Sequence, residues 1–385
     1  MLPLDGVLVI ALEHAVAAPF ATRQLADLGA RVVKIERRGT GDFARAYDTT
    51  VEGQASYFVW LNRGKESVEL DIKDPADRMV LDALIERADV FVSNLGPGAV
   101  ERLALDAATL RAARPDLVHC TVTGYGPDGP YRNKKAYDLL VQCETGLLSV
   151  TGSPDAPAKA GMSVADIAAG MYAYTGILTA LYQRERTGEG ASLDVAMIDA
   201  LGEWMAQPAL FAAYSQQPPR RTGARHPSIA PYGPYECADG DTVFLGVQND
   251  REFASLCATV LGDPALTEDP RFRHNTDRVT HSADLDPLIT AALHRVTVEE
   301  AEQLLEQAGI ANARLRSAGE LLTHPQLQAR GRWREVDIPG GTAQALLPPV
   351  NFAGRELPMR PVPSLGEHTE AVRRELGCVR TELPA

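Results

Sequence analysis

The side chain best suited to covalent chemistry in this sequence is the carboxylate of Asp166, which stands alone in the small, apolar stretch 161–172. Apolar residues recur from there at helical spacing and predict a helix over 166–187, ended by Gly188. The unpaired N–H groups and the dipole of a helix N-terminus hold a carboxylate ionised. Such a site suits a carboxylate nucleophile. Taken alone, the pattern favours an ordinary N-cap aspartate.

Other candidate residues follow short apolar runs that are typical of buried strands. His14 lies in the turn after the first run, Arg37 and Arg38 follow the second, and Asn94 opens a Gly-rich turn after a later one. Ligands of open α/β sheets bind outside the carboxyl ends of the strands. Two arginines there suit a phosphate group, and exposed turn amides suit an anion. Each segment is equally compatible with an ordinary solvated loop.

Several familiar catalytic signatures are absent from the sequence. There is no GxGxxG turn for a dinucleotide and no GxSxG elbow for a serine nucleophile. The histidines never occur at HxH or HxxxH spacing, and the five cysteines contain no CxxC pair. We therefore expect neither a metal nor a redox cofactor, and organic side chains must carry the chemistry.

The composition narrows the class of protein. The chain has 385 residues, of which 45% are hydrophobic and 23% charged, so it can build a substantial core. A formal net charge of −13 argues against nonspecific binding to nucleic acid or anionic membranes. No charged segment followed by an apolar one opens the chain, and no window approaches 18 uninterrupted apolar residues. We expect a cytoplasmic protein with reduced thiols.

The order of the predicted elements indicates the fold class. Strand-like runs alternate with helical patterns over 1–213 and predict a Rossmann-like α/β domain with a doubly wound, mostly parallel sheet. The composition changes at a Pro- and Gln-rich linker, 214–224. A hairpin followed by helical patterns then predicts a smaller α+β domain over 225–330. The remaining tail, 331–385, carries a second hairpin and a short helix.

Taken in order, these segments resemble the family III CoA-transferases, the class of formyl-CoA and carnitine CoA-transferases. The motifs that carry the resemblance are 4–7, 17–30, 32–36, 62–65 with 70–73, 94–98, 124–126 and 136–138. The resemblance covers essentially the whole chain, and the ordered set is far more specific than any one motif. It implies that the tail 331–385 completes the large domain and that two subunits interlock like the rings of a chain as a homodimer.

The resemblance also implies roles for individual residues. Asp166 matches the family's nucleophilic aspartate. The implied contacts to coenzyme A are His14, Ala15, Val16, Ala17, Arg37, Leu70 to Lys73, Asn94, Leu95, Gly96, Arg102, Lys135, Ala136, Tyr137 and Asp138. Where formyl-CoA transferase has a glycine-rich loop over its intermediates, this chain has 246–250, so we expect Gly246, Gln248 and Asn249 at the substrate.

The segment 223–232 looks like the branch of the family that acts on succinyl-CoA and C4 to C6 dicarboxylates. Arg225 or His226 would then hold the distal carboxylate of the substrate. The same segment is equally compatible with a linker that binds nothing. The resemblance therefore predicts a dicarboxylate substrate without fixing which acid is used.

The expected reaction passes through two covalent intermediates, an aspartyl anhydride and an aspartyl-CoA thioester, both at Asp166. Two alternatives remain open at this point. The related α-methylacyl-CoA racemases use a histidine as acid and base where Tyr137 stands here, and tyrosine is a poor proton acceptor near neutrality. The third possibility is a noncatalytic CoA-binding protein.

Overall fold

The computed structural model describes residues 1–215 and 218–378. These residues form two compact units. The first comprises Met1–Gly146, Ala160–Ala209 and Gln326–Ala385, and the second comprises Leu147–Lys159 and Leu210–Pro325. The predicted linker 214–224 includes residues 216–217, which lie outside the described residues.

The segment 147–159 belongs to the second unit, although the sequence places it in the large domain. Its contacts with the predicted linker 214–224 explain the difference. Gly223 N donates to Gly152 O at 2.9 Å, and Arg221 Nε donates to Ser153 O at 2.9 Å. Hydrogen bonds between segments so far apart in the chain cannot be read from local patterns.

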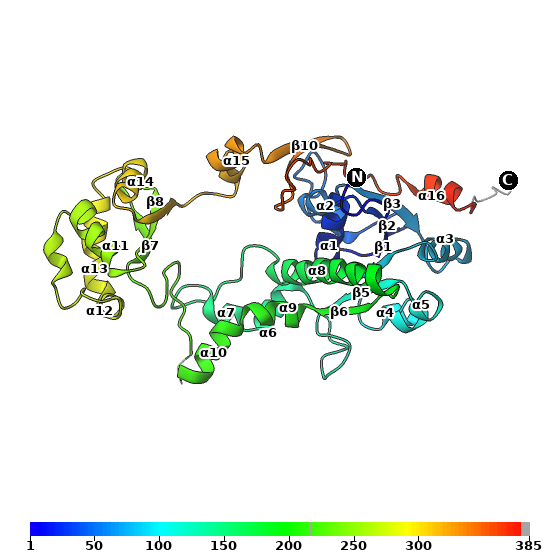
Figure 1. Cartoon of the computed structure of the whole chain (residues 1–385), viewed down its shortest axis with the longest axis horizontal. Coiled ribbons are helices and arrows are strands. Elements are labelled where there is room, and N and C mark those ends of the chain that lie inside the picture. Colours follow the sequence, from blue (N-terminus) through cyan, green and yellow to red (C-terminus); the bar gives the residue numbers. More distant parts are fainter. Residues whose placement is uncertain (216–217, 379–385) are drawn as a thin grey trace. The chain divides into compact units, whose positions relative to one another are not determined.

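A six-stranded parallel sheet forms the centre of the first unit, as the sequence predicts (Figure 1). Its order is β3-β2-β1-β4-β5-β6, so the direction of winding reverses between β1 and β4. In doubly wound sheets, ligands bind at this reversal, outside the carboxyl ends of the strands. The strands are β1 (Leu8–Leu12), β2 (Arg31–Arg37), β3 (Lys65–Leu70), β4 (Val90–Ser93), β5 (Val118–Thr123) and β6 (Ser192–Ala196).

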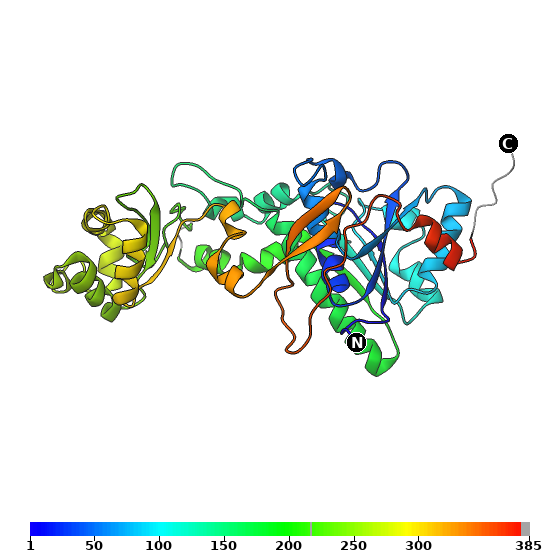
Figure 2. The same cartoon turned by 90° about the horizontal axis from the view of Figure 1, so that it is seen from above.

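Helices cover both faces of this sheet. Figure 2 shows α1 (Ala17–Asp27) and α8 (Val164–Thr187) together on one face, and α3 (Pro75–Ile85) with α16 (Thr369–Glu375) on the other. The second face is sealed by a buried apolar cluster that joins the strands to α3 and α16. The smaller elements of the unit are η1 (Phe43–Ala46), α2 (Ser56–Asn62), α4 (Ala99–Arg102), α5 (Ala107–Ala113), α6 (Asp138–Glu144), α9 (Met197–Trp204), and the predicted hairpin β10 (Trp333–Ile338) and β11 (Gly341–Leu346).

Helix α8 connects β5 to β6 and is long and apolar enough, by length and composition, to cross a membrane. Half of its most apolar window is buried inside the protein. It packs along α1 and lies against β5 and β6. Its apolar character therefore serves the core of the α/β unit, where a crossover helix must bury one side.

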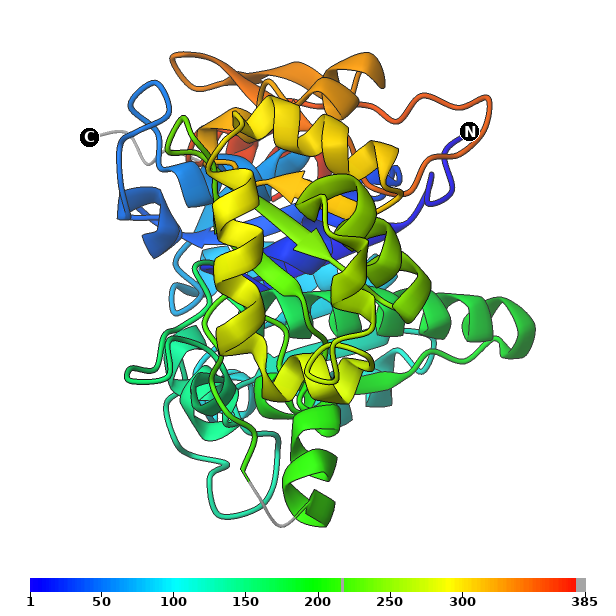
Figure 3. The ribbon, with the colours of Figure 1, turned by 90° about the vertical axis from the view of Figure 1, so that its left-hand side faces the viewer.

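The second unit contains a three-stranded antiparallel sheet with helices. Strands β7 (Tyr232–Glu236) and β8 (Thr242–Gly246) form the predicted hairpin, and β9 (Ala311–Arg314) adds an unpredicted third strand. In Figure 3 the helices of this unit face the viewer and the sheet is seen between them. They are α11 (Asp250–Leu256), α12 (Asn275–Thr280), α13 (Ser282–Leu293) and α14 (Val298–Gln307).

Candidate active site

The first turn of α8 is capped from another helix. The carboxylate of Asp138 accepts a hydrogen bond from the backbone N–H of Ala165 at 2.8 Å, and its second oxygen accepts one from Gln142 Nε2 at 2.6 Å. Helix α8 begins at Val164, and Asp166 lies inside its first turn. The prediction that Asp166 starts and caps the helix is therefore wrong, because Asp138 supplies the acceptor.

Asp166 is half-buried, and no hydrogen bond or ion pair to its carboxylate is found within residues 1–215 and 218–378. Burial, together with the negative charge of Asp138, raises its pKa to about 7. The sequence predicts the opposite direction, since it assigns the helix N-terminus to Asp166 alone. The carboxylate instead stands partly desolvated and unpaired, which favours attack on a substrate carbonyl once it is ionised.

Gly170 lets the start of α1 approach α8 closely. A Cβ at Gly170 would lie 2.6 Å from Ala17 O, which only glycine avoids. Gln24 Nε2 also lies 3.5 Å from Met171 Sδ, so α1 and α8 contact each other beyond Gly170. Asp166 lies one turn before Gly170, and so on the side of α8 that packs against the start of α1.

That loop, 13–16, is held at the reversal of the sheet. His14 N donates to Asn94 Oδ1 at 3.0 Å, and Asn94 Nδ2 donates to His14 O at 2.8 Å. The structure thus brings together His14 and Asn94, two residues predicted to contact coenzyme A. The Asn94 side chain fixes the loop, and burial lowers the pKa of His14, so its imidazole is neutral near pH 7.

Half-exposed aromatic residues extend from this loop and were not predicted as part of the site. The His14 ring lies 4.7 Å from the Phe43 ring, followed by Tyr47, Tyr57 and Trp60 in successive contacts. Burial and the charges of Asp42 and Asp166 raise the pKa of Tyr47 to about 12. Tyr47 therefore keeps its hydroxyl proton near neutral pH. The only sequence signal for this group of contacting rings is the recurrence of aromatic residues over 43–60.

Exposed cations gather after the strands of the same sheet. Arg37 is the last residue of β2, and Lys73 follows the end of β3. Arg102 lies over the Gly-rich turn, with Nη1 3.4 Å from Pro97 O. In the described part of the chain none of these three side chains, nor that of Lys135, forms an ion pair, and all are exposed. They are free to bind anionic groups such as phosphates.

The structure restricts other predicted contacts. Arg38 is paired with the buried Asp77, so of the two neighbouring arginines only Arg37 is free. The Leu70 side chain is 2% exposed in the core, which leaves only its backbone for a ligand. Tyr137 precedes α6 and is 67% exposed, and Ala136 is pressed against Gly124. Leu95 and Gly96 lie in the turn after β4, and their predicted contacts stay predictions.

Two of the predicted substrate residues of the second unit, His226 and Gly246, contact Tyr232. The His226 ring stacks on Tyr232 with centroids 5.2 Å apart, and a Cβ at Gly246 would lie 3.3 Å from the same ring. Arg225 is already paired with Asp286 at 3.0 Å, so its guanidinium is engaged within the unit. His226 is exposed and remains the more accessible of the two.

Gln248 and Asn249 lie at the start of α11. Asn249 caps this helix, with Oδ1 accepting from Glu252 N at 3.0 Å, and Gln248 N donates to Glu252 Oε2 at 2.8 Å. The backbone of this loop is therefore fixed by Glu252. The side chain of Gln248 is exposed.

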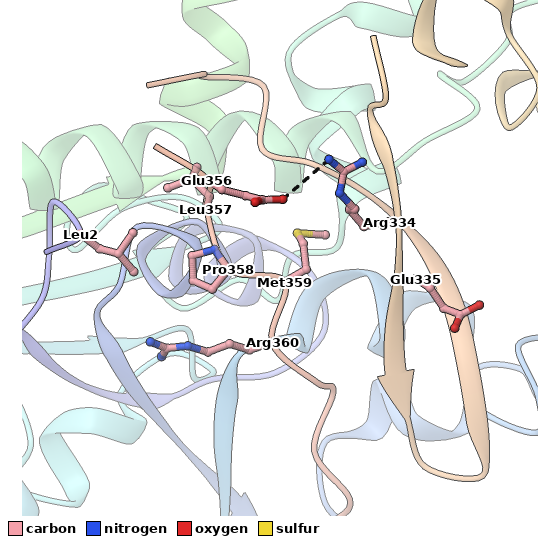
Figure 4. A pocket seen from close by; sticks show the side chains of 8 residues that line it. All are labelled: Leu2, Arg334, Glu335, Glu356, Leu357, Pro358, Met359 and Arg360. Atoms are coloured by element: carbon pink, nitrogen blue, oxygen red, sulfur yellow. Dashed lines mark ion pairs between the residues drawn. The ribbon is translucent and has the colours of Figure 1, made fainter. Parts of the chain in front are cut away.

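A hollow of about 530 Å³ lies elsewhere on the first unit (Figure 4). Arg334 and Glu356 face each other across it at 3.8 Å. Its lining comprises Leu2, Arg334, Glu335, Glu356, Leu357, Pro358, Met359 and Arg360, and includes none of the predicted site residues. This hollow therefore lies apart from the candidate site at the carboxyl edge of the sheet.

Comparison with known proteins identifies the family of the chain. The family model for CoA-transferase family III matches residues 4–369. The chain is 36% identical over 380 residues to the acetyl-CoA:oxalate CoA-transferase of Acetobacter aceti, covering 97% of this chain and 95% of that protein. It is 35% identical over 393 residues to the succinate–glutarate CoA-transferase of Agrobacterium fabrum, covering 99% and 98%.

A solved structure shows the same fold. The crystal structure of a CAIB/BAIF family protein from Brucella suis matches with a TM-score of 0.87 and 33% identity, covering 97% of this chain and 99% of that one. The chain belongs to CoA-transferase family III. The racemase-like and noncatalytic alternatives are therefore not retained.

Proposed function

We propose that this enzyme transfers CoA from a dicarboxylyl-CoA donor, such as succinyl-CoA, to a free carboxylic acid through covalent intermediates at Asp166. The observation that carries the proposal is the unpaired, half-buried Asp166 carboxylate on α8, one turn before the contact of Gly170 with the start of α1. Exposed, unpaired cations follow the strands of the same sheet edge and suit the phosphates of coenzyme A.

The reaction begins when an Asp166 carboxylate oxygen attacks the thioester carbonyl carbon of the donor. The C–S bond breaks, CoA leaves as a thiolate, and a mixed anhydride remains. The thiolate then attacks the Asp166 carbonyl carbon and expels the donor acid, which gives an aspartyl-CoA thioester. The acceptor carboxylate repeats both steps in reverse and restores Asp166. Each step exchanges one acyl–heteroatom bond for another, which lowers each barrier.

The surroundings of Asp166 support this role. With a pKa of about 7, a large fraction of Asp166 is ionised at neutral pH, and its burial makes the ionised form more basic than an exposed aspartate. No side chain caps the start of α1, so its first N–H groups are available to stabilise an oxyanion. A site closed to water would protect the anhydride from hydrolysis.

A dicarboxylate is the substrate class that we favour. The Agrobacterium fabrum relative is named for succinate and glutarate, and the segment 223–232 resembles that branch. Because Arg225 is paired with Asp286, His226 is the better candidate for the distal carboxylate. The test is exchange from succinyl-CoA to matched pairs of mono- and dicarboxylic acids of equal chain length. Faster transfer to the monocarboxylates would remove the dicarboxylate assignment.

We also propose that the active form is an interlocked homodimer. Helix α10 (Ala206–Ser215) supports this, because none of its residues is buried, while Leu210, Phe211 and Tyr214 are 59%, 49% and 84% exposed. An apolar helix left uncovered is typical of an interface. Light scattering of the purified protein should give twice the chain mass of 41.5 kDa, and a stable monomer with full activity would contradict the proposal.

A further inference from the structure

We propose that Asp42 is a positioning residue for acyl transfer, because it holds the backbone of Ala15 in the conformation that places the start of α1 beside Asp166. Asp42 is not among the residues that the sequence singles out, and it does not face the substrate itself. The inference rests on the proposed reaction at Asp166. It identifies the buried carboxylate that sets the shape of the loop next to the nucleophile.

The loop adopts a conformation that needs support. Ala15 has φ +61°, in the left-handed region where the Cβ of a non-glycine residue crowds the backbone. Asp42 Oδ1 accepts the N–H of Ala15 at 3.0 Å and that of Ala44 at 2.9 Å. This single oxygen therefore ties the strained loop to η1. Directly after Ala15, Val16 begins α1 without a side-chain cap.

The Asp42 carboxylate is itself fixed by buried charges. Lys34 Nζ lies 2.9 Å from Asp42 Oδ2, and neither side chain is exposed. Lys34 Nζ also lies 3.4 Å from Glu13 O, at the first residue of the loop. Lys65 completes the group through Glu13 at 2.6 Å. The loop is thus held at Glu13 and at Ala15 by one network of ions.

Such a network is poorly explained by stability alone. Replacing a buried ion pair by apolar residues of similar volume is often neutral or stabilising, because desolvation of the charges is costly. A buried network attached to a strained loop instead suggests that the position of the loop is what matters.

The test compares Asp42→Ala and Asp42→Asn with the wild-type protein in single-turnover acylation of Asp166 by succinyl-CoA, with thermal unfolding and CoA binding measured alongside. We expect Asp42→Ala to slow acylation by up to about 100-fold, the loss that a misplacement of about 1 Å can cause. Asn retains an acceptor for the Ala15 N–H, so Asp42→Asn should lose less. If Asp42→Ala fails to fold, the same comparison is made between Asp42→Asn and the double variant that combines Asp42→Asn with Ala15→Gly.

The second-site variant Ala15→Gly gives a readout that a structural role would not move. Glycine adopts positive φ at no steric cost. In the Asp42→Ala background it should therefore restore part of the lost acylation rate, whether or not the melting temperature recovers. Wild-type acylation by Asp42→Ala, or a loss that Ala15→Gly leaves unchanged, would overturn the inference.

The matched control is Asp27→Asn, which breaks another buried ion pair of the same unit. Asp27 lies at the far end of α1, 2.8 Å from Arg63. This variant should lower the melting temperature and keep the acylation rate within about twofold, because it leaves the loop untouched. If the wild-type protein itself forms no adduct at Asp166, the proposed reaction fails. If the wild type forms the adduct and Asp42→Ala forms it equally fast, only the inference about Asp42 fails.

Discussion

Asp138 caps the helix that carries Asp166, and its charge adds to burial in raising the pKa of Asp166 to about 7. One carboxylate thus orders the first turn of α8 through the Ala165 N–H and hinders ionisation of its neighbour. The proposed nucleophile, Asp166, is consequently only partly ionised at neutral pH. It gains charge near neutrality, in a site where no protein cation is paired with it among the described residues.

The first prediction concerns the pH dependence of exchange. Only ionised Asp166 can attack the thioester, so kcat/KM should rise with pH and level off above about pH 7. Below that value it should fall about tenfold per pH unit, as expected for one deprotonation. The measurement is the initial rate of CoA exchange from pH 5 to pH 9. A flat profile, or a midpoint near pH 4, would show that Asp166 has an ordinary pKa or does not act.

The second prediction isolates the contribution of Asp138. Asp138→Asn keeps an oxygen to accept the Ala165 N–H and removes the negative charge. The pKa of Asp166 should therefore fall, and the acid limb of the kcat/KM profile should move to lower pH. The quantity to compare is the midpoint of the kcat/KM profile. Asp138 is also a predicted contact to coenzyme A, so a change in KM alone does not test the prediction. A midpoint that stays fixed or moves upward would contradict the electrostatic coupling.

The third prediction links activity to stability. The pKa of Asp166 is higher in the folded protein than in the unfolded chain, so the folded state holds the proton more tightly. The protein is therefore stabilised by protonated Asp166 below about pH 4, and it loses this stability as the pH rises from about 4 to about 7. Asp166→Asn cannot ionise and avoids the loss. It should be more stable than the wild type at pH 8 by up to about 4 kcal/mol, and the difference should shrink toward pH 4. Urea unfolding at both pH values, at one protein concentration, measures this; equal curves at pH 8 would refute it.

The fourth prediction tests the contact between α1 and α8. Gly170→Ala places a Cβ 2.6 Å from Ala17 O, so the start of α1 must move away from Asp166. Overpacking of this kind costs about 1 to 3 kcal/mol, and we expect exchange to slow on the order of tenfold. Gly176→Ala on the same helix is the control, because its Cβ meets only Leu193 Cδ1 at 3.5 Å. Equal effects of both substitutions on exchange would contradict the positional argument.

Periodicity was sufficient to predict most elements of the sheet and the helix that carries Asp166. It missed β3, where Glu66 and Lys65 interrupt the apolar pattern. The structure explains both residues, since Glu66 pairs with Arg31 at 2.9 Å and Lys65 is buried against Glu13 at 2.6 Å. The helical pattern over 198–213 also predicts a single helix, whereas the structure has two, α9 and α10, separated at Met205.

The site was predictable in its location and not in its internal contacts. Strand ends placed His14, Arg37 and Asn94 at one edge of the sheet, because parallel strands share that edge. The cap from Asp138 to Ala165 spans 27 residues, and the bond from Asp42 to Ala15 joins two loops. Contacts of this kind depend on the packed fold, and no local pattern encodes them.

The central claim is that Asp166 becomes covalently acylated, and trapping tests it most directly. The protein is incubated with succinyl-CoA, quenched with hydroxylamine and digested, and the peptide that contains Asp166 is read by mass spectrometry. We predict a hydroxamate on Asp166 in the wild-type protein and none in Asp166→Asn, which should still bind CoA but catalyse no exchange. An unmodified Asp166 in an enzyme that turns over, or near-normal exchange by Asp166→Asn, would contradict the account.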